Sequence, residues 1–219
     1  MGYYMMLIEQ IFLVGINEKS NKISFDYKDY LFYGAIIMDL VLKDKISFSR
    51  RNLGIEILNL DSTNDAILDK MLDFINADRK NKTLIDICSR FMKRSNKSDF
   101  IEVITSQLES LGSIKYLGKK RLKRRYQVIE PELKTKLLKE INAVLIDKQE
   151  PSKELMLLLS LLRIESNFTK IIPKKLRKIA EKRILKLVRH ESIGKTLQDY
   201  IDQMKEDLQD AFDDILDDD

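Results

Sequence analysis

The sequence predicts a mainly α-helical protein: a single-domain bundle of amphipathic helices around a buried helical centre, with one or two short β-hairpins. Seven glycines and three prolines are few for 219 residues, apolar residues mostly recur every three or four positions, and a hydrophobic fraction of 44% can supply a packed core. No linker rich in Pro, Gly or Ser divides the chain. We therefore expect one helical domain over residues 1–198, followed by an acidic helix or tail over residues 199–219.

Apolar patterns near the start of the chain predict two central helices and a hairpin. The stretch "MMLIEQIFLVGI" (5–16) is an apolar helix, either alone or leading into a short strand. The stretch "DYLFYGAIIMDLVLKDK" (29–45) is apolar almost all round, which is typical of a buried helix. In "KISFSRRNLGIEIL" (45–58), apolar and polar residues alternate on both sides of a turn-like centre, which indicates a β-hairpin.

Two amphipathic helices should follow this hairpin. The segment "LDSTNDAILDKMLDFINAD" (60–78) begins with capping residues, and its buried face should consist of Ile67, Leu68, Met71, Leu72 and Ile75. The segment "TLIDICSRFMKR" (83–94) is the second helix, and its apolar face includes Cys88.

The next region contains the highest density of positive charge in the chain. A helix should run from about Asp99 to Gly112, where a glycine is typical of a helix C-terminus. A short strand over residues 114–117 and a second strand ending at Val128 should follow. In the second strand, a set that is mostly apolar alternates with charged and polar side chains. We expect the basic stretch "GKKRLKRRYQV" (118–128) to lie on this hairpin, with its charges on the loop and the outer face.

The rest of the chain should be helical. Pro131 begins one helix. The stretch "KELMLLLSLLRI" (153–164) is apolar nearly all round, so we expect it to be the most buried helix. The stretch "PKKLRKIAEKRILKLVRHE" (173–191) should be amphipathic, with inward residues Leu176, Ile179, Ala180, Leu187 and Val188. Its outward residues should be Lys174, Lys175, Lys178, Lys182 and Lys186.

Charge is unevenly distributed along the chain, although the net charge is only +4. Six of the eleven residues in 118–128 are Lys or Arg. Between Arg163 and Lys195, eleven Lys/Arg stand against three Glu, whereas residues 199–219 contain ten Asp/Glu and one Lys. This asymmetry predicts a basic surface that contacts anions. The acidic segment is a rival occupant of that surface, because it could fold back onto it until an anionic membrane competes.

Motifs for catalysis, cofactors and metals are missing from the sequence. It contains no GxGxxG, GxxxxGK, HExxH or CxxC, and Cys88 and His190 are the only residues of their kinds. Helix capping and a solvated face explain the regularly spaced Asp61, Asp65 and Asp69 better than a metal site does. We expect a non-enzymatic protein without a cofactor. No stretch approaches the roughly 20 apolar residues of a membrane span, and no signal peptide is apparent, so we expect a cytoplasmic location.

The basic stretch 118–128 allows three interpretations: a solvated surface, the wing of a winged-helix nucleic-acid-binding domain, or a surface for anionic membranes. A winged helix needs a recognition helix with Lys or Arg, yet the helix over 99–112 contains carboxylates and neither cation. Each Lys or Arg near an anionic bilayer contributes about 1 kcal/mol. We favour the membrane surface and keep nucleic acid as the alternative. The apolar face of the hairpin, with Leu122, Tyr126 and Val128, should pack on the domain or on a second copy.

Four segments resemble the Golgi phosphoprotein 3 family over residues 7–188. The stretch "LFYGAIIMDLVLKDKISF" is similar to the family's Gly-Ala helix that leads into a hairpin, and "LDSTNDAILDKMLDFI" resembles its "PTGD-x-LLDE-x-L" segment. The stretch "LESLGSIKYL…RYQV" resembles "LVE-(R/K)-G-(V/I)-L" followed by a hairpin, and "IIPKKLRKIAEKRILKL" resembles the family's late basic helix. The order and spacing of these segments carry the resemblance more than any single motif does.

The resemblance implies a helical fold with a protruding hairpin, and a peripheral membrane protein without enzymatic activity. Eukaryotic members bind phosphatidylinositol 4-phosphate and sort Golgi glycosyltransferases through their cytosolic tails, so tails of membrane proteins are expected partners. Many members are bacterial or archaeal, and the chain resembles this prokaryotic type. Related proteins are thought to self-associate through the hairpin, which makes a homo-oligomer a further expectation.

The resemblance also points to candidate head-group ligands. The family's lipid pocket uses a Trp and an Arg before the Gly-Ala helix, together with two basic residues before "LVE-x-G". These positions correspond here to Ser24, Tyr33, Ser98 and Ile101, and none of the four is basic. Two cations about one turn upstream could take the place of the second pair, Arg94 and Lys97. The full set of candidates is Arg94, Lys97, Lys119, Lys120, Arg121, Lys123, Arg124, Arg125, Lys174, Lys175 and Lys178.

Overall fold

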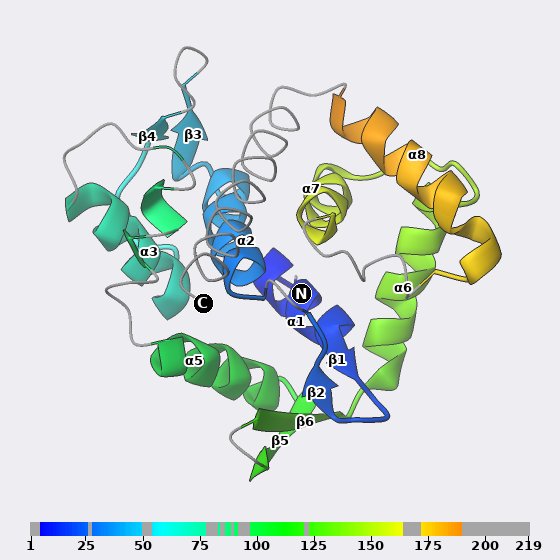
Figure 1. Ribbon diagram of the computed structural model, residues 1–219. Coiled ribbons are helices and arrows are strands. Elements are labelled where there is room, and N and C mark those ends of the chain that lie inside the picture. Colours follow the sequence, from blue (N-terminus) through cyan, green and yellow to red (C-terminus); the bar gives the residue numbers. More distant parts are fainter. Residues whose placement is uncertain are drawn as a thin grey trace, which may run out of the picture.

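A computed structural model describes residues 5–25, 28–49, 54–77, 83, 86–88, 90–91, 97–120, 123–163 and 172–189. The fold is mainly helical, and two-stranded antiparallel sheets project from the helices (Figure 1). The predicted fold class is therefore confirmed in its mainly α character. No helix among these residues is long and apolar enough to cross a membrane.

Three buried helices form the centre of the molecule. Helix α2 (Lys28–Leu42) packs against α1 (Leu7–Gly15) and α7 (Lys153–Leu162). Every residue from Leu31 to Val41 is buried, and so is every residue from Met156 to Leu162. The prediction of a buried helix at 153–164 is thus confirmed, but α2 is buried just as completely. Neighbouring elements cover α2 and α7 on every side, and a helix in such a position needs apolar residues all round.

Amphipathic helices surround this centre (Figure 1). They are α3 (Ala66–Ala77), α5 (Lys97–Ser110), α6 (Pro131–Leu145) and α8 (Arg177–Arg189), which follows a 3₁₀ turn, η2 (Lys174–Leu176). The predicted inner face of α3 is confirmed, since all five residues are buried: Ile67, Leu68, Met71, Leu72 and Ile75. Pro131 begins α6 as predicted, and Gly112 follows α5 with a φ of 71°, a conformation that glycine adopts without strain.

The inner face of α8 differs from the prediction at Ile179 and Ile184, and the side chain of Val188 lies outside the described residues. Ala180 and Ile184 are buried, but Ile179 is 48% exposed. The helix turns by about 100° per residue. When Ala180 and Ile184 face the core, Ile179 therefore points to the side of the helix and remains exposed. The five predicted outward lysines are all exposed: Lys174, Lys175, Lys178, Lys182 and Lys186.

Aspartates of the 60–78 segment hold the start of α3. The carboxylate of Asp65 accepts hydrogen bonds from the backbone N–H of Ile67 (2.9 Å) and Leu68 (3.0 Å), which is a helix N-cap. The carboxylate of Asp69 accepts bonds from the Ser62 hydroxyl (2.6 Å) and the Thr63 backbone N–H (2.7 Å). Capping therefore explains these residues. Across the described ranges, no cluster of His, Cys, Asp or Glu could hold a metal ion.

Asp39 is a buried carboxylate between α1 and α2. It accepts hydrogen bonds from the backbone N–H of Leu7 (2.9 Å) and Ile8 (3.2 Å), at the positive end of α1. Burial raises the pKa of Asp39 to about 7, the two backbone bonds oppose this rise, and the carboxylates of Glu9 and Asp65 add to it. The centre of the fold thus contains a group that titrates near neutral pH.

Three hairpins emerge from the helical body among the described residues, where the sequence predicted one or two. Strands β3 (Ile46–Phe48) and β4 (Ile55–Ile57) form the predicted first hairpin. Strands β5 (Ile114–Lys120) and β6 (Lys123–Val128) form the predicted basic hairpin. The third hairpin pairs β1 (Ile16–Asn17) with β2 (Lys22–Ile23); a short strand after the first helix was one expected alternative, but the partner strand β2 was not predicted. It escaped prediction because two-residue strands contain no alternation to detect.

Candidate anion-binding surfaces

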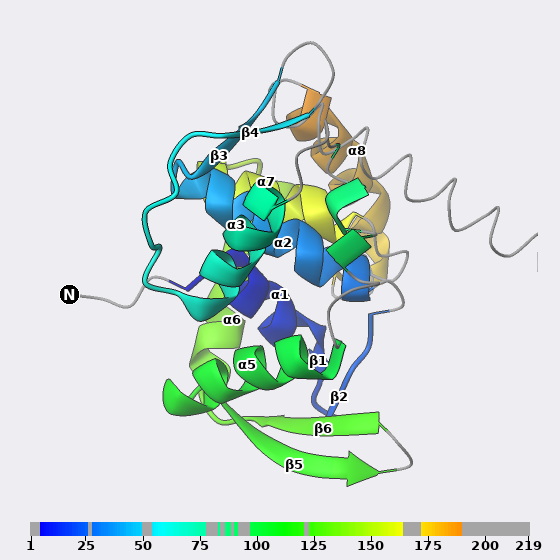
Figure 2. The same cartoon turned by 90° about the vertical axis from the view of Figure 1, so that its left-hand side faces the viewer.

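The basic hairpin is fixed to the domain by aromatic residues. Tyr126 of β6 is 1% exposed. Its ring meets that of Phe12 edge-on, with centroids 5.0 Å apart, and lies 5.6 Å from that of Tyr116. The backbone N–H of Tyr126 donates to the Asn21 carbonyl (2.8 Å), which joins β6 to the neighbouring β1–β2 hairpin (Figure 2). The inner face therefore packs on the domain, which is one of the two expected arrangements.

A β-bulge lengthens the hairpin beyond the prediction. The register pairs Tyr116 with Tyr126 and then shifts, so that Lys119 pairs with Arg124 and Lys120 with Lys123. The extra residue stands at Leu117–Gly118, where Gly118 has a φ of 81°. The prediction of a strand ending at residue 117 is therefore wrong, because the glycine lets the strand continue. Cations expected on the loop lie within the strands instead.

Five cations of this hairpin form what we call the hairpin surface: Lys115, Lys119, Lys120, Lys123 and Arg125. The four lysines are exposed, and Arg125 is half-buried. Like charges face each other across the strands at Lys120 and Lys123, and such pairs destabilise a hairpin. Sequence reasoning missed Lys115, although its position between Ile114 and Tyr116 already placed it on the opposite face from those two residues.

Arg124 does not belong to this surface. It lies on the same face as Tyr126, and its guanidinium donates to the Glu102 carboxylate of α5 (2.8 Å). The arginine side chain is 15% exposed and the glutamate 66%. The prediction that all charges point outward is wrong here, because α5 supplies a carboxylate to the inner face. A second α5 carboxylate, Glu109, accepts the backbone N–H of Tyr116 (2.6 Å), so the helix beside the hairpin presents acids to it.

A second cationic surface lies on η2 and α8. We call the exposed Lys174, Lys175, Lys178, Lys182 and Lys186 the α8 surface. Two apolar side chains, Ile179 and Leu185, are exposed on the same helix. Within the described part of the chain, no ion pair involves any of the five lysines. Their charge therefore faces solvent.

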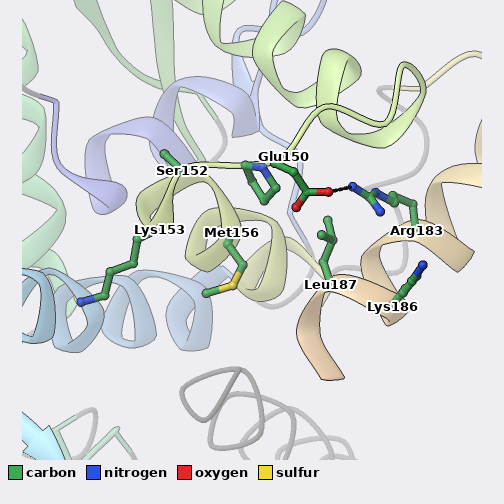
Figure 3. Close-up of a pocket in the computed structure, with 8 residues that line it drawn as sticks. Glu150, Ser152, Lys153, Met156, Arg183, Lys186 and Leu187 are labelled. Atoms are coloured by element: carbon green, nitrogen blue, oxygen red, sulfur yellow. Dashed lines mark hydrogen bonds and ion pairs between the residues drawn. The ribbon is translucent and has the colours of Figure 1, made fainter. Parts of the chain in front are cut away.

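A cavity of about 270 Å³ adjoins this surface, between the start of α7 and α8 (Figure 3). Arg183 of α8 reaches across to the loop before α7, where its guanidinium donates to the Glu150 carboxylate (2.9 Å). Arg183 is 15% exposed, whereas Glu150 is 84% exposed. Met156, Leu187 and Lys186 also line the cavity. The geometry is that of a shallow hollow with a mixed polar and apolar lining and an ion pair at its rim.

The other candidate ligands give no site. Arg94 and Arg121 lie outside the described residues, and so does the side chain of Lys97 at the start of α5. Of the positions that the resemblance singled out, Tyr33 is buried and packs against Phe91 with centroids 5.4 Å apart. The Ser24 hydroxyl donates to the Gly15 carbonyl (3.2 Å). The described residues therefore place no cation at these positions.

The two cationic surfaces lie at opposite ends of the molecule. In both views the hairpin is at the bottom and α8 near the top (Figures 1 and 2). They form two separate surfaces and no single pocket. Both lie within the range matched by the family model of Golgi phosphoprotein 3 (GPP34), which covers residues 7–204. No curated protein matches the chain.

Proposed function

Since the chain belongs to the Golgi phosphoprotein 3 family, we propose that it is a peripheral membrane protein that binds anionic lipid head groups through the hairpin surface. The observation that carries this proposal is the rigid presentation of exposed cations. Tyr126 and the Arg124–Glu102 pair fix the hairpin to the domain, while Lys115, Lys119, Lys120 and Lys123 remain exposed. The protein acts from the cytoplasmic side, and tails of membrane proteins are its expected cargo.

The energy available to such a surface is sufficient for reversible docking. Each Lys or Arg near an anionic bilayer contributes about 1 kcal/mol, so five cations supply about 5 kcal/mol. Leu117, at the bulge, is 37% exposed and adds an apolar contact at the same surface. Because head-group selectivity needs placed arginine forks, we expect binding to follow the density of negative charge more than the identity of one lipid.

Co-sedimentation with vesicles tests this proposal. We expect the full chain to bind phosphatidylcholine vesicles only when phosphatidylserine or a phosphoinositide is added, and to dissociate as salt rises. The variant Lys119→Gln/Lys120→Gln/Lys123→Gln should lose up to about 100-fold in affinity. A matched control with the same change in net charge replaces three exposed lysines elsewhere: Lys43, Lys136 and Lys139.

The control variant should bind like the unaltered chain. Equal losses of affinity in the two variants would mean that only the net charge of the protein matters. Binding that does not depend on the anionic lipid content would contradict the proposal. Duplex DNA serves as the competing ligand in the same assay. The carboxylates of Glu102 and Glu109 lie beside the hairpin and would repel a phosphate backbone. Hairpin-dependent binding to DNA, with no binding to vesicles, would favour the nucleic-acid alternative.

A further inference from the structure

Four lysines form a stripe along the α8 surface. Lys174, Lys178, Lys182 and Lys186 are spaced by four residues, and all four are exposed. Side chains four residues apart lie one turn apart on the same side of a helix, so neighbouring lysines repel each other. The only acidic residue between 172 and 189 is Glu181. The stripe therefore destabilises the helix unless negative charge lies over it.

Apolar side chains accompany the stripe. Ile179 and Leu185 are exposed on α8 itself, and Met156 and Leu187 line the adjoining cavity (Figure 3). A small anion would neutralise the lysines and leave Ile179 and Leu185 in water. An amphipathic segment with carboxylates would satisfy both, because it can cover apolar side chains and place negative charge beside the lysines.

The chain itself contains such a segment. Residues 199–219 have ten Asp/Glu and one Lys. Eight of the ten acidic residues follow residue 204, where the family match ends. Apolar residues recur at helical spacing through this segment, and this pattern predicts an apolar stripe along one side of a helix. Asp207 and Asp214 border the stripe. The stripe consists of Ile201, Met204, Leu208, Phe212 and Ile215.

The length of the connecting chain puts this segment within reach of α8. Helix α8 ends at Arg189, and nine residues lie between it and Asp199. Nine extended residues span up to about 30 Å, and the 13 residues of α8 make a helix about 20 Å long. The acidic segment can therefore fold back along all of α8. A short tether gives an effective concentration in the millimolar range, which favours docking within one chain over docking on a second copy at micromolar protein.

We propose that residues 199–219 dock as an amphipathic helix on the α8 surface of the same chain. Their carboxylates lie over the lysine stripe, and their apolar residues cover Ile179 and Leu185. The docked segment neutralises the α8 surface and leaves the hairpin surface, at the other end of the molecule, open. Docking is independent of the function proposed above; its consequence, that an anionic membrane competes with the segment for α8, rests on that function.

Distance measurements between spin labels test docking without any membrane. Cys88 is the only cysteine and is buried, so the native chain should take up little label. One labelled pair is Glu181→Cys on α8 with Gln209→Cys in the acidic segment. The control pair keeps Gln209→Cys and moves the first label to the hairpin at the exposed Gln127. We expect a short, narrow distance distribution for the α8 pair at low salt. The distances should lengthen at 1 M salt, because the Debye length falls to about 3 Å and the charges are screened from each other.

The control pair should give a long, broad distribution at either salt concentration. Neutralising the segment at Glu206, Asp207, Asp210, Asp213 and Asp214, as Gln or Asn, should abolish the short distance of the α8 pair. A broad distribution for the α8 pair at low salt overturns the proposal. So does a short distance to Gln127→Cys, which would place the segment on the hairpin. A mixture of two singly labelled chains should show no short distance, and a short one would mean docking between copies.

A cycle of vesicle-binding measurements tests the competition. In the full chain, Lys178→Gln/Lys182→Gln/Lys186→Gln should change affinity for anionic vesicles by less than about twofold, because the lysines are already covered. In the chain with the neutralised segment, the same three substitutions should lower affinity by at least about tenfold. Equal effects in the two backgrounds contradict competition. If neither chain binds vesicles, the function proposed above fails, and the spin-label result still decides the docking.

Discussion

The hairpin surface and the α8 surface have similar charge, and in each one an arginine and the lysines play different parts. Arg124 on the hairpin and Arg183 on α8 are both 15% exposed, and each pairs with a well-exposed glutamate, Glu102 or Glu150. The lysines around them are exposed. Arginine therefore fixes the element to the domain, as its forked guanidinium suits, while lysine presents charge to solvent. Basic residues that look alike in the sequence thus have separate roles.

The two surfaces also differ in how the element beneath them is anchored. The hairpin is held by a few side chains, chiefly the buried Tyr126, which packs against Phe12, and Arg124, which pairs with Glu102. Helix α8 is held by small and aliphatic side chains along its length, among them Ala180 and Ile184. A single substitution can therefore detach the hairpin from the domain. Helix α8 should stay in place when one of its buried side chains is shortened.

Tyr126→Ala should have the largest effect on stability. Removing a fully buried aromatic side chain costs about 3–5 kcal/mol, and the hairpin would lose its attachment. Leu187→Ala on α8, at a partly buried position, should cost no more than about half as much. Tyr126→Phe keeps the ring and is the control, with an expected loss of about 1 kcal/mol. Urea unfolding measures all three, and similar losses for Tyr126→Ala and Leu187→Ala would contradict the difference in anchoring.

The centre beneath both surfaces should make stability depend on pH. Burial raises the pKa of Asp39 to about 7 in the folded chain, while an unfolded aspartate titrates near 3.9. The folded state therefore binds the proton more tightly, and this group's contribution to the free energy of unfolding falls as pH rises from about 4 to about 7. The loss approaches about 4 kcal/mol at most.

Asp39→Asn should remove most of that slope. Urea unfolding of both chains between about pH 4 and about pH 8 gives the comparison. An equal fall in stability for the variant would assign the slope to other groups, such as Glu9. Measurements on either cationic surface should accordingly be compared at one pH.

Arg124→Gln and Arg183→Gln should each destabilise the fold by about 1 kcal/mol, since each removes a partly buried ion pair and its packing. The neighbouring Lys123→Gln should change stability by less than about 0.5 kcal/mol. Denaturant unfolding checks this division of roles between arginine and lysine. Similar losses of stability for Arg124→Gln and Lys123→Gln would contradict this division of roles.

Lys182→Gln should have the smallest effect and the opposite sign. Lys182 lies between Lys178 and Lys186 in the stripe, so in the chain with the neutralised segment the substitution removes two repulsive pairs and should stabilise by about 0.5 kcal/mol. If the acidic segment lies over the stripe, this gain disappears at low salt, because an attraction is lost as well. Thermal unfolding at low and high salt distinguishes the two cases.

Much of this architecture could be predicted because apolar periodicity determines which faces are buried. The inner face of α3 and the burial of α2 and α7 follow directly from that pattern. The bulge at Leu117–Gly118 could not be predicted, since a glycine in a basic stretch suggests a loop as readily as a strand. The pairing of Arg124 with Glu102 depends on the position of α5 beside the hairpin, which local sequence does not contain. The acidic segment 199–219 lies outside the described residues and stays a prediction.

The most informative measurement compares the two surfaces on the same vesicles. Phosphatidylcholine vesicles with phosphatidylserine are titrated with the full chain, with Lys119→Gln/Lys120→Gln/Lys123→Gln, and with Lys178→Gln/Lys182→Gln/Lys186→Gln. We expect the hairpin variant to lose up to about 100-fold in affinity and the α8 variant less than about twofold. Unchanged binding by the hairpin variant, or a larger loss in the α8 variant, would contradict the assignment of membrane docking to the hairpin surface.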